Sequence, residues 1–316
     1  MKNFAITGVA GYIAPRHLQA IKETGNRLVA ALDPHDSVGI LDRFDMGVDF
    51  FTEFERFDRH LELLRRQGSE RRVDYLAICS PNYLHDAHIR LALRIGADAV
   101  CEKPLVLNPW NLDALEELEK ETGKKVYTIL QLRVHPSLLK LKAEIVPAAR
   151  KREIVLTYVT ARGTWYLYSW KGSPEESGGL ASNIGIHFFD FLLWVFGKCV
   201  SYEVHLNNAR KMAGVLELEH ATVKWYLSID RADLPESVQK ENRTTYRSIT
   251  LDGKEIEFSE GFTDLHTLLY RKILEGRGFG ISDARPSVEL VHGIRTAKPT
   301  GGSSGVHHFL KEKLAK

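Results

Sequence analysis

Along the first 130 residues, short apolar runs alternate with stretches whose apolar residues recur every three or four positions. Phe54, Phe57, Leu61 and Leu64 show the second spacing, which is typical of a helix, whereas a short run bounded by turn or charged residues is typical of a buried strand. Nearly continuous apolar strands that alternate with helices predict a parallel sheet covered on both faces. The strand-like runs are 3–7, 27–32, 73–80, 97–101 and 125–130.

The pattern changes after about residue 131. A helical piece leads into a longer strand, a second helical stretch ends at Gly197, and several strand-like runs then follow without helices between them, before two final helices. Such strands predict a mostly antiparallel or mixed sheet. We therefore expect an α/β chain with a doubly wound parallel domain, 1–131, and a second domain of α+β type with a large sheet, 132–316. The predicted elements of the second domain are helices at 138–146, 178–197, 263–275 and 286–298, and strands at 153–163, 200–206, 220–229, 245–251 and 255–259.

Composition and charge narrow the function classes. Of the 316 residues, 43 are Lys or Arg and 41 are Asp or Glu, so a net charge of +2 gives no argument for nucleic acid. Cys79, Cys101 and Cys199 are too few and too scattered for a disulfide framework or a zinc motif, and we expect them to be reduced. No run approaches the roughly 18 apolar residues that a membrane span needs, and no signal segment precedes the first strand. We expect a cytoplasmic protein without a metal site.

The segment "AITGVAGYIAPRH", residues 5–17, joins the first predicted strand to a helix. Its G-x-x-G-x-x-A pattern is a looser form of the G-x-G-x-x-G loop, in which glycines let the backbone approach a diphosphate at a helix amino terminus. Pro15 would lie in the first helical turn, where its missing N–H costs nothing. A plain turn is the alternative. The residues that we expect to contact a dinucleotide here are Gly8, Gly11, Tyr12 and Ile13.

Asp33 follows the second strand, nineteen residues after Ala14, close to the spacing at which a carboxylate accepts ribose hydroxyls in Rossmann-type domains. A carboxylate would repel a 2′-phosphate, and no arginine follows it directly. We therefore expect NAD rather than NADP as the cofactor. The alternative is that Asp33 caps a helix or a turn.

Two longer stretches resemble a known family. "AICSPNYLHDAHIRLALRIGADAVCEKP" (77–104) and "GGLASNIGIHFFD" (178–190) carry a Ser-Pro-Asn with a histidine three residues on, a Glu-Lys-Pro, and a glycine pair that leads to a histidine and an aspartate. With the glycine loop, these marks resemble the glucose–fructose oxidoreductase/inositol dehydrogenase/rhizopine catabolism family over nearly the whole chain. The resemblance implies further cofactor contacts from Ser80, Asn82, His85, Glu102, Lys103 and Gln131, with Glu102 on the nicotinamide ribose.

Within the family, "ARGTWYLYSWKGSPEESGGLASNIGIHFFD" (161–190) and "WYLSIDRADLPE" (225–236) resemble a subgroup of nucleotide-sugar dehydrogenases. These enzymes oxidise the 3′-hydroxyl of UDP-N-acetylglucosaminuronate in bacterial O-antigen (lipopolysaccharide) synthesis, and an aminotransferase uses the ketone. Some relatives pass the hydride to 2-oxoglutarate, and others depend on the downstream enzyme. The resemblance implies this UDP-sugar as the substrate.

Oxidation of a secondary alcohol requires a base for the hydroxyl proton while the nicotinamide accepts the hydride. Lys103, at the end of the fifth strand, and His187, on a predicted helix that also carries Asn183, are the two candidates. The alternatives are a solvated strand end for Lys103 and a core position for His187. Most of the family has aspartate where this chain has Asn183, and an amide does not shuttle a proton, so Asn183 is expected to hydrogen-bond the sugar.

The substrate's diphosphate and carboxylate require cations, and aromatic rings can stack on a base or sugar face. The cations nearest the motifs, and the aromatic residues beside them that could stack on a ring or sugar face, are Arg133, Arg162, Lys171, Trp165, Tyr166, Tyr168 and Trp170. Of these, we expect the three cations, Trp165 and Tyr166 to bind substrate. The aromatic run has two alternatives, an oligomer interface or a hydrophobic core. A large sheet with one uncovered face predicts a homo-oligomer, a dimer or a tetramer.

Three rival functions keep the same fold. The first is a dehydrogenase of a free sugar or inositol, which would not need the basic and aromatic segment. The second is an NAD-dependent glycosidase, which returns its cofactor to the oxidised state. The third is an NAD-binding regulator without chemistry, which would have no use for Lys103 and His187.

Overall fold

The computed structural model describes residues 1–145, 150–256, 264–302 and 305–314. The chain divides into two compact units, Met1–Val134 with Thr263–Arg285, and His135–Phe262 with Pro286–Lys316. The prediction of two continuous domains placed the segment 263–285 in the second, whereas this segment belongs to the first unit.

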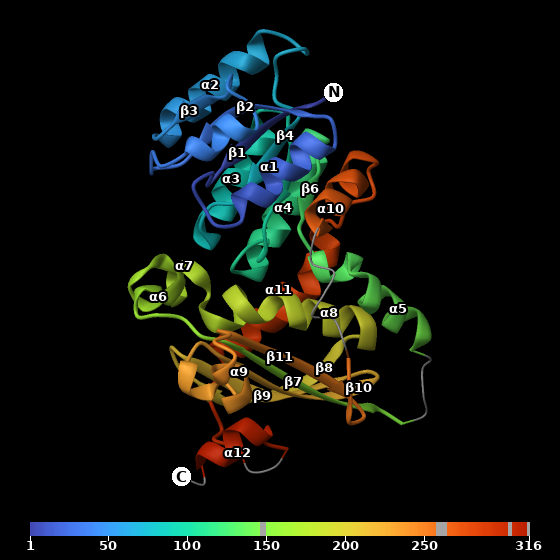
Figure 1. Ribbon diagram of the computed structural model, residues 1–316. Coiled ribbons are helices and arrows are strands. Elements are labelled where there is room, and N and C mark those ends of the chain that lie inside the picture. The colour runs from blue at the N-terminus through green and yellow to red at the C-terminus, as the bar shows by residue number, and fades with distance from the viewer. Residues whose placement is uncertain (146–149, 257–263, 303–304, 315–316) are drawn as a thin grey trace. The chain divides into compact units, whose positions relative to one another are not determined.

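The first unit contains a six-stranded parallel sheet (blue to green in Figure 1) with the strand order β3-β2-β1-β4-β5-β6. This is the order of dinucleotide-binding domains, and it confirms the predicted doubly wound sheet. The predicted runs 3–7 and 27–32 are strands over those residues, and β3 is an additional short strand that the apolar pattern did not reveal. The strands are β1 (Asn3–Thr7), β2 (Arg27–Leu32), β3 (Asp49–Phe51), β4 (Tyr75–Ile78), β5 (Asp98–Cys101) and β6 (Val126–Thr128).

Helices of the first unit come from both of its chain segments. The late helix α10 packs against α1, and the Tyr270 ring on α10 stacks on Phe4 of β1 with a centroid distance of 5.7 Å. The first unit is therefore complete only with residues that follow most of the second unit in sequence. Its helices are α1 (Ala14–Glu23), α2 (Phe54–Arg66), α3 (His85–Arg94), α4 (Pro109–Thr122) and α10 (Leu265–Leu274), with the 3-10 turns η1 (Gly39–Arg43), η2 (Asn82–Leu84) and η3 (Gln131–Val134).

The second unit contains a six-stranded sheet in the order β12-β11-β7-β10-β9-β8. Only β7 and β10 run parallel, so the predicted mostly antiparallel sheet is confirmed. The predicted run 255–259 extends beyond β12 into 257–259, which lies outside the described residues, as does residue 263 of the predicted helix 263–275 and residue 146 of the helix 138–146. The strands are β7 (Arg152–Thr160), β8 (Cys199–Asn207), β9 (Lys211–Leu218), β10 (Ala221–Ser228), β11 (Thr245–Leu251) and β12 (Lys254–Glu255).

The last long helix begins earlier than its pattern predicts and is shared by the two units. The helix expected at 286–298 starts at Ile281, so that Pro286 lies inside it. The boundary between the two units falls next to this proline. The helices of this unit are α5 (Pro136–Glu144), α6 (Trp165–Tyr168), α7 (Pro174–Ser177), α8 (Ile186–Phe196), α9 (Glu236–Lys240), α12 (His308–Leu314) and the part of α11 (Ile281–Thr296) that follows Arg285, with the turns η4 (Trp170–Gly172), η5 (Ala181–Gly185) and η6 (Arg231–Asp233).

Helix α8 covers one face of the second sheet. Phe189 on α8 meets Trp225 of β10 edge to face at 5.3 Å, and both side chains are fully buried. Gly214 of β9 lies beneath Trp225, where a Cβ atom would come within 2.1 Å of the Glu203 carbonyl oxygen. By length and composition the stretch Pro174–Phe196 could cross a membrane, although no long apolar run marks it in the sequence. Its most apolar 18 residues are 72% buried within the protein, as in a core helix.

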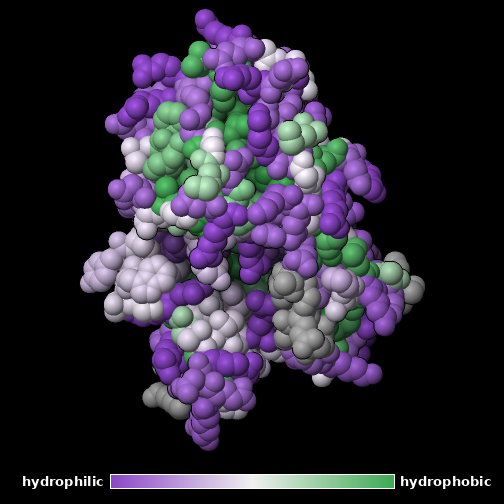
Figure 2. Space-filling view, turned by 45° about the horizontal axis from the view of Figure 1, so that its top comes forward, coloured by the Kyte–Doolittle hydropathy of each residue, from purple (hydrophilic) through white to green (hydrophobic). Residues whose placement is uncertain are grey.

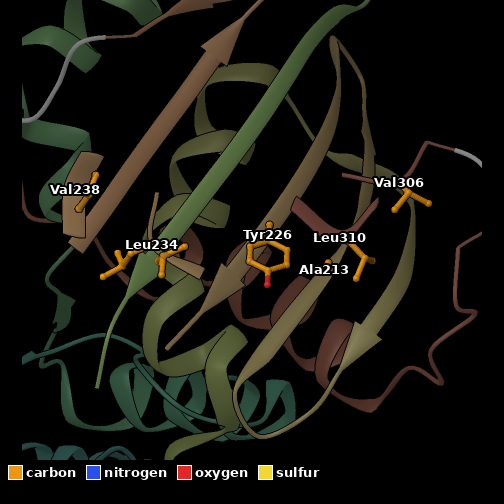
Figure 3. Packing of buried hydrophobic residues seen from close by; sticks show 7 residues of the cluster. Ala213, Tyr226, Leu234, Val238, Val306 and Leu310 are labelled. Atoms are coloured by element: carbon orange, nitrogen blue, oxygen red, sulfur yellow. The ribbon is translucent and has the colours of Figure 1, made fainter. Parts of the chain in front are cut away.

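The opposite face of this sheet is covered in part by α9 and by the segment around α12 (Figure 3). Tyr226 of β10 lies at the centre of this cluster and stacks on His307 at 5.5 Å. Its hydroxyl donates to the buried Asp233 carboxylate at 2.6 Å. The buried residues of the cluster are Val159, Ala213, Tyr226, Leu234, Val238, Val306 and Leu310.

This packing predicts a stability that falls in acid. His307 is fully buried beside the Thr157 hydroxyl, and burial lowers its pKa from 6.5 to about 3. Because the unfolded chain binds this proton more readily, stability is complete above pH 6.5 and is lost as the pH falls toward 3. Between pH 7 and pH 5 the loss from this one group is about 2 kcal/mol. Urea unfolding of the wild type and of His307→Phe at both pH values measures it.

The His307→Phe variant keeps a ring but cannot titrate, so its free energy of unfolding should differ between the two pH values by about 2 kcal/mol less than that of the wild type. His220→Gln, at the exposed end of the turn before β10, serves as the control. An unchanged pH difference in His307→Phe would contradict the assignment.

Candidate active-site residues in each unit

The glycine loop of the first unit packs directly on the strand end beside it. Gly8 has a φ of +76°, and a Cβ atom there would lie 2.5 Å from the Cys79 carbonyl oxygen that follows β4. A Cβ atom on Gly11 would lie 2.9 Å from the Gly8 carbonyl oxygen. The loop lies so close to the sheet that no side chain fits at Gly8, and a ligand there would meet the loop's backbone. This geometry suits the approach of a diphosphate, as the sequence predicted.

Helix α1 begins directly after this loop. The side chain of its N-cap residue, Ile13, makes no capping hydrogen bond. The first turn of the helix contains Pro15 and carries no acidic residue. The N–H groups of that turn and the helix dipole therefore favour an anion without competition from a carboxylate. Tyr12, which we predicted to contact the cofactor, is 90% exposed at this end of the helix.

Asp33 ties the end of β2 to the glycine loop. Its Oδ2 accepts the Ala10 N–H and its Oδ1 accepts the His35 N–H, both at 2.9 Å, and the residue is buried. The bond to His35 is the turn cap that we considered as the alternative, and it leaves further lone pairs on both oxygens. The two readings are therefore compatible, since a carboxylate that is fixed by two backbone donors is also well oriented toward a ribose.

The loop after β4 carries the Ser-Pro-Asn motif, and its polar side chains are buried. The Ser80 hydroxyl lies 2.9 Å from Nδ1 of His88, which also lies 3.1 Å from the Thr7 hydroxyl. Burial lowers the pKa of His88 to about 4, so this ring is neutral near pH 7. Asn82 is buried in the same loop.

His85 joins this loop to the Glu-Lys-Pro loop. Its Nδ1 lies 2.7 Å from the Pro104 carbonyl oxygen and its Nε2 lies 3.0 Å from the Ser80 carbonyl oxygen. Burial lowers the pKa of His85, and these two hydrogen bonds oppose that effect because they favour the doubly protonated ring. We predicted a cofactor contact here, but the ring is 1% exposed and both nitrogens face the protein's own backbone. Its geometry is that of a link between two loops.

The Glu-Lys-Pro segment follows β5 at the carboxyl edge of the sheet. The Glu102 N–H donates to the Ile78 carbonyl oxygen at 3.0 Å, and the Lys103–Pro104 peptide bond is cis. Lys103 is half-buried, whereas Glu102 is buried, with a carboxylate oxygen 3.0 Å from a nitrogen of His17 and 3.0 Å from a nitrogen of His266.

No short sequence pattern marks His17 and His266 as partners of Glu102. They lie 85 and 164 residues from Glu102, and no local spacing connects the three. The three side chains each offer one atom that could bind a metal ion, and these atoms lie within 4.8 Å of one another. Both histidines already contact the Glu102 carboxylate, and the absence of a metal site stays a prediction.

Arg133 and Gln131 lie in η3, after the last strand of the parallel sheet. Arg133 is buried, and its guanidinium donates to the Asp283 carboxylate at 3.0 Å and to the Asp283 carbonyl oxygen at 2.8 Å. It also lies 5.3 Å from the centre of the Phe279 ring. The cation that we predicted to bind substrate therefore already has a carboxylate partner within its own unit.

In the second unit, the glycine pair and a π-helical turn precede α8. Gly178 and Gly179 have φ values of +76° and +73°, which glycine adopts without strain. Asn183 lies in the π-helical turn, and its amide donates to the Tyr166 hydroxyl at 2.7 Å. His187, half-buried, follows in the first turn of α8, so the two residues do not share the regular α-helix that their spacing suggested. Such turns occur frequently at functional sites.

Two of the three predicted cations, Arg162 and Lys171, lie close to the aromatic residues of α6 and η4. Helix α6 is on the left in Figure 1, and the surface on the left in Figure 2 is pale, neither strongly hydrophilic nor strongly hydrophobic. The Lys171 ammonium lies 4.5 Å from the centre of the Trp170 ring and 5.8 Å from that of Trp165. Burial and the neighbouring Arg162 charge lower the pKa of Lys171. Trp165 is 54% exposed, whereas Tyr166 is buried. Two cations beside an exposed ring can hold an anionic ligand with a flat group.

Comparison with curated proteins gives partial matches. The D-glucoside 3-dehydrogenase of Escherichia coli (strain K12) is 25% identical over 142 residues, 44% of this chain and 40% of that protein. The putative UDP-kanosamine synthase oxidoreductase subunit of Amycolatopsis mediterranei (strain S699) is 27% identical over 135 residues, 42% of this chain and 37% of that protein. The matched segments thus span about two fifths of these relatives.

Comparison with solved structures gives matches over nearly the whole chain. The WlbA (WbpB) dehydrogenase of Thermus thermophilus in complex with NAD and α-ketoglutarate is 54% identical, with a TM-score of 0.94, covering 98% of this chain and 100% of that one. The same enzyme in complex with NAD and UDP-GlcNAcA is 53% identical over the same shares, also with a TM-score of 0.94. WlbA of Bordetella pertussis, at 20% identity and a TM-score of 0.75 over 96% of each chain, shares the fold.

Residues 2–130 match the oxidoreductase family's NAD-binding Rossmann fold, and residues 153–232 match its C-terminal alpha/beta domain. These two matches and the 54% identity over nearly the full length agree with the motifs that both units carry. The chain belongs to the glucose–fructose oxidoreductase/inositol dehydrogenase/rhizopine catabolism family of oxidoreductases.

Proposed function

We propose that the protein is an NAD-dependent dehydrogenase that oxidises the 3′-hydroxyl of UDP-N-acetylglucosaminuronate to a ketone, in bacterial O-antigen synthesis. The observation that carries this proposal is the 54% identity, over 98% of the chain, to a dehydrogenase solved with NAD and, in a second structure, with UDP-GlcNAcA. An aminotransferase would consume the ketone. The protein would act in the cytoplasm as a homo-oligomer, a dimer or a tetramer.

NAD, when bound, supplies the acceptor for the hydride. Gly8 and Gly11 would let the loop backbone approach its diphosphate at the amino terminus of α1, and Asp33 would accept hydroxyls of the adenosine ribose. The space at Gly8 that no side chain can enter supports this role. Further contacts are proposed from Tyr12, Ile13, Ser80, Asn82, Glu102, Lys103 and Gln131.

Lys103 and His187 would carry the proton chemistry. Lysine ordinarily titrates near 10.4, and a cationic nicotinamide ring beside a partly buried lysine would disfavour its ammonium form. His187 lies beside the π-helical turn that presents Asn183, whose amide would hydrogen-bond the sugar while it holds the Tyr166 hydroxyl. A base at Lys103 would take the hydroxyl proton directly or through His187.

The charged groups of the substrate would be held by Arg162 and Lys171, with Trp165 and Tyr166 beside them. The carboxylate partner of Arg133 favours the other two cations for this task. The complex of the Thermus thermophilus enzyme with α-ketoglutarate supports the same compound as the hydride acceptor that regenerates NAD in this chain.

The cofactor assignment predicts that NAD binds well and NADP poorly. Asp33→Asn removes the charge that would repel a 2′-phosphate but retains one side-chain oxygen that can accept a loop N–H. Asp33→Ala removes the charge and both side-chain oxygens. Both should narrow the ratio of NAD to NADP affinity in calorimetry. Asp98→Asn is the matched control, because this aspartate also accepts a backbone N–H, at 2.9 Å, but at the opposite end of its strand. Equal affinities in the wild type would refute the assignment.

The substrate assignment predicts a preference for UDP-N-acetylglucosaminuronate over UDP-N-acetylglucosamine. A charge-assisted hydrogen bond to the added carboxylate contributes about 1.5–3 kcal/mol, or roughly 10- to 150-fold in kcat/KM. Arg162→Gln or Lys171→Gln should reduce this preference more than it reduces turnover of the neutral sugar. Equal turnover of the two sugars by the wild type would exclude this substrate.

The proton-transfer assignment predicts that Lys103→Met leaves the fold and NAD binding nearly intact but lowers the oxidation rate roughly 100- to 10,000-fold. Lys103→Arg should not restore activity, because guanidinium keeps its proton. If Lys103 and His187 act together in one proton transfer, the double variant with His187→Asn should lose much less activity than the product of the two single losses. Retention of more than about a third of the activity in Lys103→Met, measured by NADH absorbance, would leave His187 as the base.

A further inference from the structure

Glu102 divides its two carboxylate oxygens between different partners. Oε1 lies 3.0 Å from Nε2 of His17 on α1 and 3.0 Å from Nε2 of His266 on α10. Oε2 accepts the Lys103 N–H at 3.2 Å. The side chain is 10% exposed, so one oxygen is fully engaged inside the unit and the other retains a lone pair.

The hydrogen bonds fix the tautomer of His17. With Nε2 donating to the carboxylate, Nδ1 is an acceptor, and the Tyr270 hydroxyl lies 2.7 Å from it. Burial raises the pKa of Tyr270 well above its ordinary value, so this hydroxyl keeps its proton and donates. The chain from Tyr270 through His17 therefore directs a donor at Oε1, and His266 provides the second donor.

The charge of Glu102 depends on these donors. Burial alone raises the pKa of this carboxyl, but the hydrogen bonds from His17 and His266 outweigh burial and hold it well below its ordinary value. Burial lowers the pKa of His17 more than the bond to Glu102 raises it. The titratable groups that face or adjoin Glu102 are His17, His266, Tyr270, Cys79, Cys101, His85 and Lys103.

We infer that His17 and His266 are positioning residues for the cofactor: they anchor Oε1 of Glu102 and keep the carboxyl ionised, which leaves Oε2 to accept a hydroxyl of the nicotinamide ribose. This inference rests on the proposed NAD-dependent function. It also extends to Lys103, whose backbone is held on one side by Glu102 and on the other by His85, which donates to the Pro104 carbonyl oxygen at 2.7 Å.

The test compares variants that remove a donor with variants that keep one. Glutamine places an amide N–H near the position of Nε2, whereas leucine has none. In His17→Leu and His266→Leu, burial should raise the pKa of Glu102 into the measured range. NAD affinity, measured by calorimetry from pH 5 to pH 9, should then fall by up to tenfold per unit below that pKa. The wild type and both glutamine variants should lack this fall in NAD affinity at low pH, which we call the acid limb.

Three controls separate positioning from general damage. Glu102→Gln should bind NAD weakly at every pH, and adding it to His266→Leu should abolish the acid limb. His307→Leu removes a buried histidine from the second unit and should lower the thermal midpoint without changing the pH profile. Tyr270→Phe, which keeps the ring, should weaken NAD binding a few-fold and tests the network should the leucine variants not fold.

Two results would overturn the inference. The first is a native pH profile of NAD binding in a folded leucine variant. The second is one tightly bound zinc ion per chain in the wild type, measured by elemental analysis and lost in His266→Leu, which would make the trio a metal site. Absence of NAD binding in the wild type would instead refute the proposed function, so the two failures are distinguishable.

Discussion

A parallel strand that is covered on both faces can carry polar side chains at its ends without burying them in an apolar core. In the first unit this constraint brings the chemistry to the carboxyl edge of one sheet. Gly8 follows β1, Asp33 follows β2, Ser80 lies just beyond β4, and Glu102 follows β5. Neighbouring strands in the order β2-β1-β4-β5 bring these four positions together, although they span nearly a hundred residues of sequence.

The sequence predicts those features that local spacing determines. The bounds of β1 and β2, the glycine loop and the cap on Asp33 all follow from short patterns. Strand β9 was missed because Gly214, which the close approach of Trp225 and the Glu203 carbonyl requires, interrupts its apolar pattern. The regular helix assumed between Asn183 and His187 contains a π-helical turn, which has no comparable sequence signal.

The buried partners of Glu102 show a different limit. His17 lies in the first turns of a helix that is recognisable from its loop, yet nothing local marks it as a hydrogen-bond donor to a residue 85 positions away. His266 and Tyr270 are four residues apart on α10, and each reaches the same network. A buried carboxylate needs donors, and a reader of the sequence can infer that need but cannot name the residues that meet it.

The first unit is built from two separate segments of the chain, and this affects how it can fold during synthesis. The chain emerges from its amino terminus, so β1 to β6 are made before residues 135–262, yet α10 is made after them. Until Tyr270 arrives, the Phe4 ring stacks on Tyr75 but lacks its second stacking partner. Until His266 arrives, the carboxylate of Glu102 lacks one of its two histidine donors. Domains generally fold in order of synthesis. This nucleotide-binding unit instead reaches its final packing only when most of the second unit has already left the ribosome.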